Sequence, residues 1–159
     1  MFILTLLRII SILLSIVGIT FLLPIVVAIY CDETAMLLPF IILLVVSIIA
    51  MLVINIPTRK IKFNLSTKKT FITVALSWLF ASLFGALPFY YSGYFNSFAD
   101  AFFESVSGIT TTGSTILSEI EILPRSINLW RCLTHWLGGM GIVTLTVALM
   151  PLLGVGGFQ

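Results

Sequence analysis

This chain of 159 residues is poor in the side chains on which most enzymes and soluble surfaces depend. It has six acidic residues, eight basic residues, one histidine and two cysteines, so that only 9% of it is charged. It has no histidine and cysteine cluster with zinc-ligand spacing, no Walker loop, and no serine, histidine and aspartate set. These absences argue against a metal site, a nucleotide-binding loop and a membrane-bound enzyme, and we expect a protein that is not an enzyme.

Hydrophobic residues make up 60% of the chain and give it a mean hydropathy of +1.22. An α-helix needs about 20 apolar residues to cross about 30 Å of hydrocarbon. Cutting the chain at its charges and turn residues leaves four segments of about that length, namely Leu4–Tyr30, Met36–Ile56, Phe71–Tyr91 and Leu129–Leu153. The sequence therefore predicts an all-α integral membrane protein with four transmembrane helices. Pro24 and Pro88 are each expected to kink a helix or to mark its last turn.

The stretch between the third and fourth segments is too short to cross a membrane. Ser97 and Asp100 have the hydroxyl and carboxylate spacing that begins a helix, and Gly108 follows soon after. A helix over about 97–107, at about 1.5 Å per residue, reaches roughly half of the bilayer depth. This pattern predicts a re-entrant pore helix.

The loop after this segment, SGITTTGS at residues 107–114, combines hydroxyl groups with two glycines. A cation that leaves water needs oxygen atoms in place of its hydration shell, and consecutive backbone carbonyls supply them. Gly113 permits backbone dihedrals that are closed to other residues. We interpret residues 108–115 as a selectivity filter. The alternative, that the threonines merely cap a turn through their hydroxyls, also fits the pattern.

The distribution of charge predicts the orientation. The stretch 58–70 contains five basic residues and no acidic one, and the positive-inside tendency places it in the cytoplasm. Both termini are then expected on the cytoplasmic side, with the pore loop entering from outside. Basic residues beside two membrane spans are topology signals or lipid contacts, and we expect lipid and no nucleic acid as partner. Cys31 and Cys132 are expected to be free thiols.

Five short motifs follow one another in order: FFESVSGITTTGST at 102–115, LP at 123–124, WR at 130–131, WLGGMGI at 136–142 and MPLLGVGGFQ at 150–159. Together they resemble the first pore repeat of the Trk/Ktr/HKT potassium transporters, and most closely the membrane subunit of bacterial Trk systems. The resemblance implies potassium transport across the cell (inner) membrane. It also implies two leading helices over 1–57, a basic cytoplasmic loop over 58–70, and one helix–pore–helix repeat over 71–159.

Members of this family carry four such repeats around one filter, and this sequence has one. We expect the N-terminal part of a longer transporter, truncated before further repeats; assembly of four copies, or with a second chain, stays open. The resemblance implies a cytoplasmic nucleotide-binding regulatory subunit as partner and potassium as the transported ligand, with no covalently bound cofactor. A small helical membrane protein that acts only in assembly is the alternative function.

The resemblance also assigns roles within the filter. The backbone carbonyls of Thr110, Thr111, Thr112 and Gly113 are expected to bind potassium. Gly108 and Gly113 are expected to set the backbone geometry of the filter.

Other residues have expected roles around the filter. Asp100 and Glu104 share a face of the pore helix, and either is expected to attract cations at the pore mouth. Glu104 is alternatively expected to support the loop by accepting hydrogen bonds from the loop's amides. Small residues in the fourth span provide either close packing or a hinge; these are Gly138, Gly139 and Gly141. Arg131 is expected to reach outward or to pair with Glu119 or Glu121, and His135 to make a packing hydrogen bond.

Overall fold

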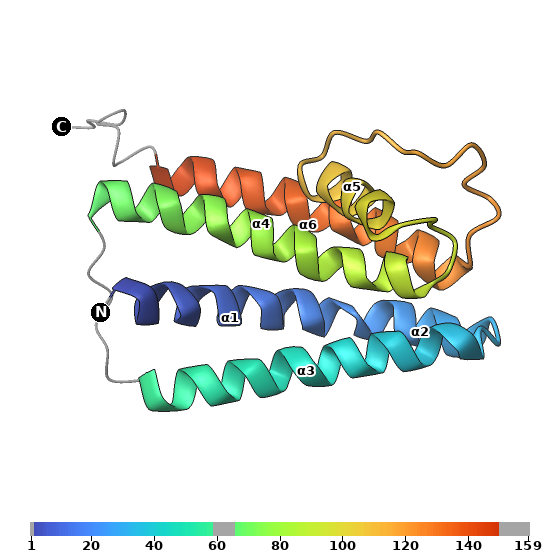
Figure 1. Ribbon diagram of the computed structural model, residues 1–159, viewed down its shortest axis with the longest axis horizontal. Coiled ribbons are helices and arrows are strands. Elements are labelled where there is room, and N and C mark those ends of the chain that lie inside the picture. The colour runs from blue at the N-terminus through green and yellow to red at the C-terminus, as the bar shows by residue number, and fades with distance from the viewer. Residues whose placement is uncertain (1, 59–65, 150–159) are drawn as a thin grey trace.

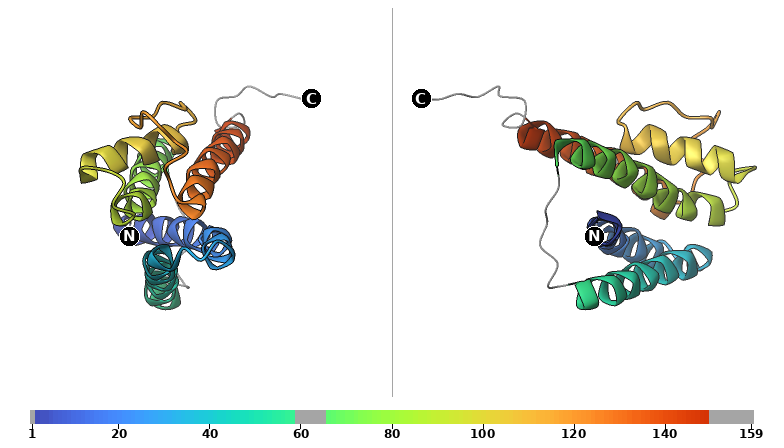
Figure 2. Two further views of the ribbon diagram at one scale, coloured as in Figure 1. Left: turned by 90° about the vertical axis from the view of Figure 1, so that its right-hand side faces the viewer. Right: turned by 60° about the vertical axis from the view of Figure 1, so that its left-hand side comes forward.

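The computed structural model describes residues 2–58 and 66–149, and within these ranges helices are the only regular secondary structure. The helices are α1 (Phe2–Thr20), α2 (Leu22–Tyr30), α3 (Thr34–Thr58), α4 (Thr67–Tyr91), α5 (Phe98–Ile109) and α6 (Arg125–Leu149). The helix α3 and the pair formed by α4 and α6 lie on opposite sides of α1, as Figure 1 and the end-on view of Figure 2 show. The short helix α5 lies against α4 and α6 near one end of the bundle. The predicted all-α membrane class is confirmed.

Three stretches of the described residues are long and apolar enough to cross a membrane: Phe2–Tyr30, Thr34–Thr58 and Lys68–Tyr91. They contain the first three predicted spans. The fourth falls on α6, which has 25 residues and is therefore about 37 Å long. That α6 also crosses the membrane stays a prediction. Most of the basic loop (59–65), the end of the fourth span (150–153) and the motif at 150–159 lie outside the described residues.

The first long helix is interrupted at Phe21, which separates α1 from α2. The amide of Phe21 donates to the carbonyl of Gly18 at 3.1 Å, three residues back, and helical bonding resumes from Ile25 to Phe21 at 3.0 Å. The cause is Pro24, because its ring has no N–H and collides with the carbonyl of the preceding turn. The predicted kink at Pro24 is confirmed, and Pro88 lies in the last turn of α4 as expected.

Aromatic side chains join the first three helices to α4 and α6. The ring of Phe21 lies 4.6 Å from that of Trp130 on α6, and 5.7 Å from each of Phe40 on α3 and Phe84 on α4. Trp130 is fully buried, and its indole N–H donates to the carbonyl of Gly85 at 3.0 Å. The start of α6 is therefore held against both the leading helices and α4.

Replacing Phe21 by alanine tests this core. We expect Phe21→Ala to lower the free energy of unfolding of this chain in micelles by about 3 kcal/mol, because the ring is fully buried among three others. Phe80→Ala is the matched control, since Phe80 is 41% exposed and its loss should cost about 0.5 kcal/mol or less. Equal losses in the two variants, measured by equilibrium unfolding, would contradict the assignment of the core.

Candidate functional site

The helix α5 begins with a reciprocal cap. The amide of Asp100 donates to the hydroxyl of Ser97 at 3.2 Å, and the amide of Ser97 donates to the carboxylate of Asp100 at 3.1 Å. This capping box satisfies two of the donors that a helix start leaves open. The helix begins at Phe98 and ends at Ile109, two residues beyond the end that the sequence predicts, so that Gly108 belongs to the helix.

The loop after α5 folds its amide groups back onto the end of that helix. The amides of Thr110, Thr111 and Thr112 donate to the carbonyls of Val106, Gly108 and Ser107 at 2.8, 2.9 and 2.9 Å. The hydroxyl of Ser107 donates to the carbonyl of Ser114 at 2.6 Å, which ties the far side of the loop to the same helix. In the part of the chain that the structure describes, the carbonyls of residues 110–113 accept no hydrogen bond.

Two residues of the loop have a positive φ. Gly113 has φ +79°, which is the positive-φ region expected for this glycine, and Thr111 has φ +57°. The value for Thr111 is not foreseen from the sequence, because a β-branched residue strongly disfavours the left-handed region. Residues 110–114 are exposed. The loop is therefore an exposed segment with a strained, hydrogen-bonded backbone, and the carbonyls of residues 110–113 accept no hydrogen bond from the described residues.

The threonine hydroxyls in this loop take part in the turn. The hydroxyl of Thr110 donates to the carbonyl of Val106 at 2.7 Å and lies 2.8 Å from the hydroxyl of Thr112. Turn capping by hydroxyls, the alternative left open by the sequence, is thus present for Thr110. This capping uses the hydroxyl of Thr110, and the carbonyls of residues 110–113 still accept no hydrogen bond from the described residues.

Glu104 is the buried charge of the site, with 1% of its surface exposed. One carboxylate oxygen lies 2.5 Å from Nε of Arg131, and the other accepts a hydrogen bond from the hydroxyl of Thr115 at 2.9 Å. The expectation that Arg131 reaches outward or pairs with Glu119 or Glu121 is wrong. The packing of α5 against α6 brings Glu104 to it instead. Glu104 contacts the loop through the hydroxyl of Thr115, not through amide hydrogens.

Glycines allow the close approach of α5 and α6. A Cβ atom on Gly108 would lie 2.1 Å from the hydroxyl of Thr134, and one on Gly138 would lie 2.1 Å from the carbonyl of Ile109. Added Cβ atoms on Gly139 and Gly141 meet their nearest neighbours, Thr111 and Trp78, at 3.9 and 3.3 Å. Gly108 has no positive φ, so the structure requires glycine there for space and not for dihedral freedom.

The histidine and the two cysteines are all placed by the structure. His135 makes a hydrogen bond of 2.9 Å through Nδ1 to the carbonyl of Arg131, which lies on its own helix and not on a neighbour. Cys31 and Cys132 are free thiols, as predicted.

Sequence reasoning missed Glu33, which lies between α2 and α3. Its carboxylate accepts hydrogen bonds from the amides of Arg125 and Ser126 at 2.7 and 3.0 Å, and from the hydroxyl of Ser126 at 2.5 Å. Pro124, directly before the first residue of α6, does signal a helix start. No local pattern reveals a capping carboxylate that lies 92 residues earlier in the chain.

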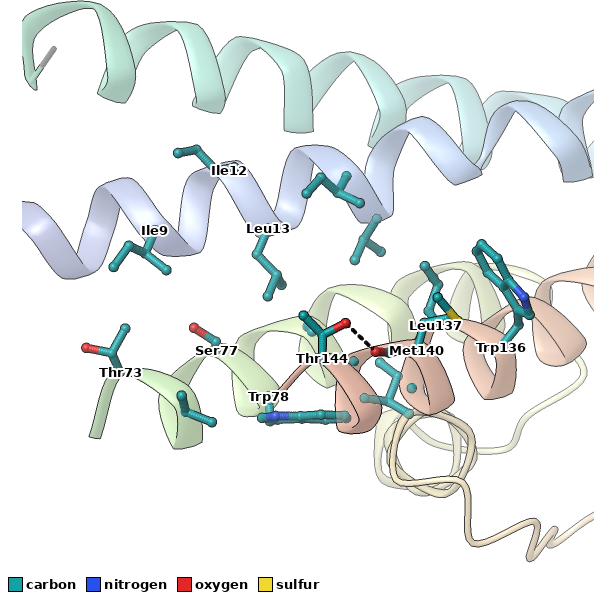
Figure 3. A pocket seen from close by; sticks show the side chains of 17 residues that line it. Ile9, Ile12, Leu13, Thr73, Ser77, Trp78, Trp136, Leu137, Met140 and Thr144 are labelled. Atoms are coloured by element: carbon teal, nitrogen blue, oxygen red, sulfur yellow. Dashed lines mark hydrogen bonds between the residues drawn. The ribbon is translucent and has the colours of Figure 1, made fainter. Parts of the chain in front are cut away.

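A cavity of about 660 Å³ lies between α1, α4 and α6, beside the end of α5. Figure 3 shows Ile9 and Leu13 of α1 facing Ser77 of α4 and Leu137 of α6 across it. The hydroxyl of Ser77 is, among the described residues, the one buried side-chain polar atom without a hydrogen-bond partner. The lining is mostly apolar, and the described residues include no group of three histidine, cysteine or acidic side chains that could hold a metal ion.

Long apolar helices and a short capped helix followed by a hydrogen-bonded loop define an all-helical membrane protein. The chain belongs to the TrkH family of cation transport proteins, whose model matches residues 36–159.

Individual relatives agree with this assignment. The Trk system potassium uptake protein TrkH of Escherichia coli K12 is 48% identical over 104 residues, which are 65% of this chain and 22% of that protein. The proteins of the same name from Halomonas elongata and Vibrio parahaemolyticus are 40% and 37% identical over 95% and 98% of this chain, and 31% and 32% of their own lengths. The chain thus spans about a third or less of these curated relatives.

The contact between α6 and the end of α5 predicts different effects for two neighbouring glycines. Gly138→Ala should lower the free energy of unfolding of this chain by about 2 kcal/mol, because the new Cβ meets the backbone of Ile109. Gly139→Ala makes the same chemical change one residue later, where space is ordinary, and it should be neutral or slightly stabilising. Unfolding in micelles with equal midpoints for the two variants would refute this packing.

The buried ion pair predicts a second contrast. Glu104→Gln should destabilise this chain by about 3 kcal/mol, because it leaves the half-buried guanidinium of Arg131 without a charged partner. Asp100→Asn removes the same charge from the start of the same helix, where it should cost about 1 kcal/mol or less. The comparison is made by equilibrium unfolding, and a loss for Glu104→Gln no larger than that for Asp100→Asn would count against the pair.

Proposed function

We propose that this chain forms the first pore repeat of a Trk-type potassium uptake protein. The observation that carries the proposal is the exposed loop at 110–113, whose amides are bonded to α5 while its carbonyl oxygens accept no hydrogen bond from the described residues. Potassium as the ion is supported by the names of the relatives, which are potassium uptake proteins.

In this proposal the carbonyl oxygens of Thr110, Thr111, Thr112 and Gly113 replace the water around a dehydrated potassium ion. The bonds from their amides to α5 hold the backbone against collapse toward the ion. The C-terminal end of α5, where the helix dipole is negative, lies directly before these residues and favours a cation there. No bound cofactor takes part, and potassium is the transported ligand.

The acidic residues of α5 have separate roles in this mechanism. Glu104 supports the filter, because its charge is balanced by Arg131 and its second oxygen holds Thr115. Asp100 is half-buried and lies at the start of α5, where it caps the helix and attracts cations at the outer mouth. Gly108 and Gly138 allow the filter helix to approach α6, which favours packing over a hinge.

One loop cannot surround an ion, so the pore also needs the remaining repeats. The rest of a longer parent chain supplies them, since the relatives are about three times as long as this chain. The protein lies in the cell (inner) membrane with both termini in the cytoplasm. At that end Arg8 of α1 donates to Asn55 and to the carbonyl of Thr58, beside the basic loop. A cytoplasmic nucleotide-binding regulatory subunit binds on this side.

Substitution of Gly113 tests the filter. Gly113→Ala should reduce rubidium uptake by about tenfold or more in cells without their own potassium uptake, because alanine at φ +79° strains the carbonyl array. Gly93→Ala is the matched control, since Gly93 has φ +75° and equally open surroundings but lies outside the filter. Equal uptake by the two variants would contradict the assigned filter.

The same uptake assay tests whether this chain transports potassium alone or only together with its downstream sequence. It compares this chain alone with the chain co-expressed with its downstream reading frame. Rescue of potassium-dependent growth only with the downstream sequence supports the longer transporter, and rescue by the chain alone supports assembly from copies. Failure of both, with the protein present in the membrane, would reject transport and favour a protein that acts only in assembly.

A further inference from the structure

The contact between Glu33 and the start of α6 goes beyond the pore repeat itself. Glu33 belongs to the leading helices, outside the repeat that the sequence defines at 71–159, yet its carboxylate accepts three hydrogen bonds from Arg125 and Ser126. Ser126 is fully buried and Glu33 is half-buried. The two bonds from Ser126 are therefore partly buried, and the bond from the amide of Arg125 is exposed.

The turn that carries Glu33 has a defined backbone. The amide of Glu33 donates to the carbonyl of Ala28 at 2.8 Å, and the amide of Met36 donates to the carbonyl of Glu33 at 2.9 Å. Asp32, directly before it, has φ +57°, a left-handed conformation that aspartate tolerates better than most residues. These constraints hold the backbone of Glu33 in place opposite the start of α6.

Among the described residues, the side-chain hydrogen bonds at the first amides of α6 are accepted by this carboxylate. The first amides of a helix have no partner within it, and Pro124 supplies a carbonyl to Asn128 but no N–H. Glu33 accepts from two of the free amides and places a negative charge at the positive end of the helix dipole. It thereby ties the start of α6 to the turn between α2 and α3.

The helix α6 is also linked to the loop after α5. Arg131 lies five residues after Ser126, about 7.5 Å along the helix. It is bound to Glu104, whose second oxygen holds Thr115 at the end of the filter. A continuous series of hydrogen bonds and one rigid helix thus joins the turn between α2 and α3 to the filter.

We infer that Glu33 is a positioning residue for the selectivity filter, acting through α6, Arg131 and Glu104. The expected effect of Glu33 on ion selectivity rests on the proposed function. The structural link between Glu33 and the loop at 110–117 does not depend on that function. In this role the leading helices set the geometry of the filter, in addition to anchoring the chain in the membrane.

The test compares Glu33→Gln with Asp32→Asn. Both remove one negative charge from the same turn, and asparagine tolerates the left-handed conformation of Asp32 as aspartate does. Only the first replaces an oxygen that accepts from α6 by an amide nitrogen that cannot. Ser126→Ala removes one of the three hydrogen bonds and serves if Glu33→Gln does not accumulate in the membrane.

The first readout is hydrogen exchange of this chain in lipid nanodiscs. Glu33→Gln should speed exchange about tenfold at residues 125–131 and also at residues 110–117, because losing a charge-assisted hydrogen bond shifts local opening by about that factor. Ser126→Ala should change the same two segments by less, and Asp32→Asn should change neither. Faster exchange confined to 125–131 would overturn the inference, since Glu33 would then be only a local cap.

The second readout is rubidium uptake with and without competing sodium, in whichever expression arm restores growth. Glu33→Gln should lower the preference for rubidium over sodium severalfold per transporter in the membrane. A change in protein amount with unaltered preference would reject the positioning role. If the unsubstituted protein transports no rubidium, the proposed function fails, and hydrogen exchange alone then decides whether Glu33 controls the loop.

Discussion

The arrangement of α5, α6 and the loop after α5 depends on the buried carboxylate of Glu104 and its partners. A lone charge in a protein interior within a membrane is very costly, and it persists only where other groups compensate it. Arg131 balances the charge, and Thr115 occupies the second oxygen. Because these partners belong to α6 and to the loop after α5, the requirement to compensate one carboxylate fixes three segments relative to one another.

Close packing of α5 against α6 brings Arg131 near enough to balance the charge of Glu104. Gly108 and Gly138 leave room for α5 and α6 to approach until an added Cβ atom would meet its neighbour at about 2 Å. Each helical glycine lowers intrinsic helix stability by about 1 kcal/mol relative to alanine. The contacts between the two helices offset that cost, since lipid-embedded helices associate mainly through packing and hydrogen bonds. Larger residues would separate Arg131 from Glu104.

Acidic side chains serve the protein structure in a consistent way. Glu33 and Asp100 bond to amides at helix starts, and Glu104 bonds to a guanidinium and a hydroxyl. These are three of the six acidic residues in the chain. In the proposed filter the oxygen atoms offered to the ion are backbone carbonyls. Such oxygens carry partial charges, so in this proposal they replace a hydration shell without holding the cation too tightly.

Local patterns in the sequence determine the helices, the cap at Ser97 and Asp100, the break near Pro24 and the family, because propensity, hydropathy and motif spacing act over a few residues. The positive φ of Thr111 and the partners of Glu33 and Arg131 do not follow from them. Arg131 has several acidic residues within plausible reach along the chain, and its partner Glu104 lies 27 residues away. Only the packing of the helices decided which carboxylate pairs with Arg131. Hydrogen bonds and ion pairs depend on the distance between atoms in space, which the separation of residues along the chain does not specify.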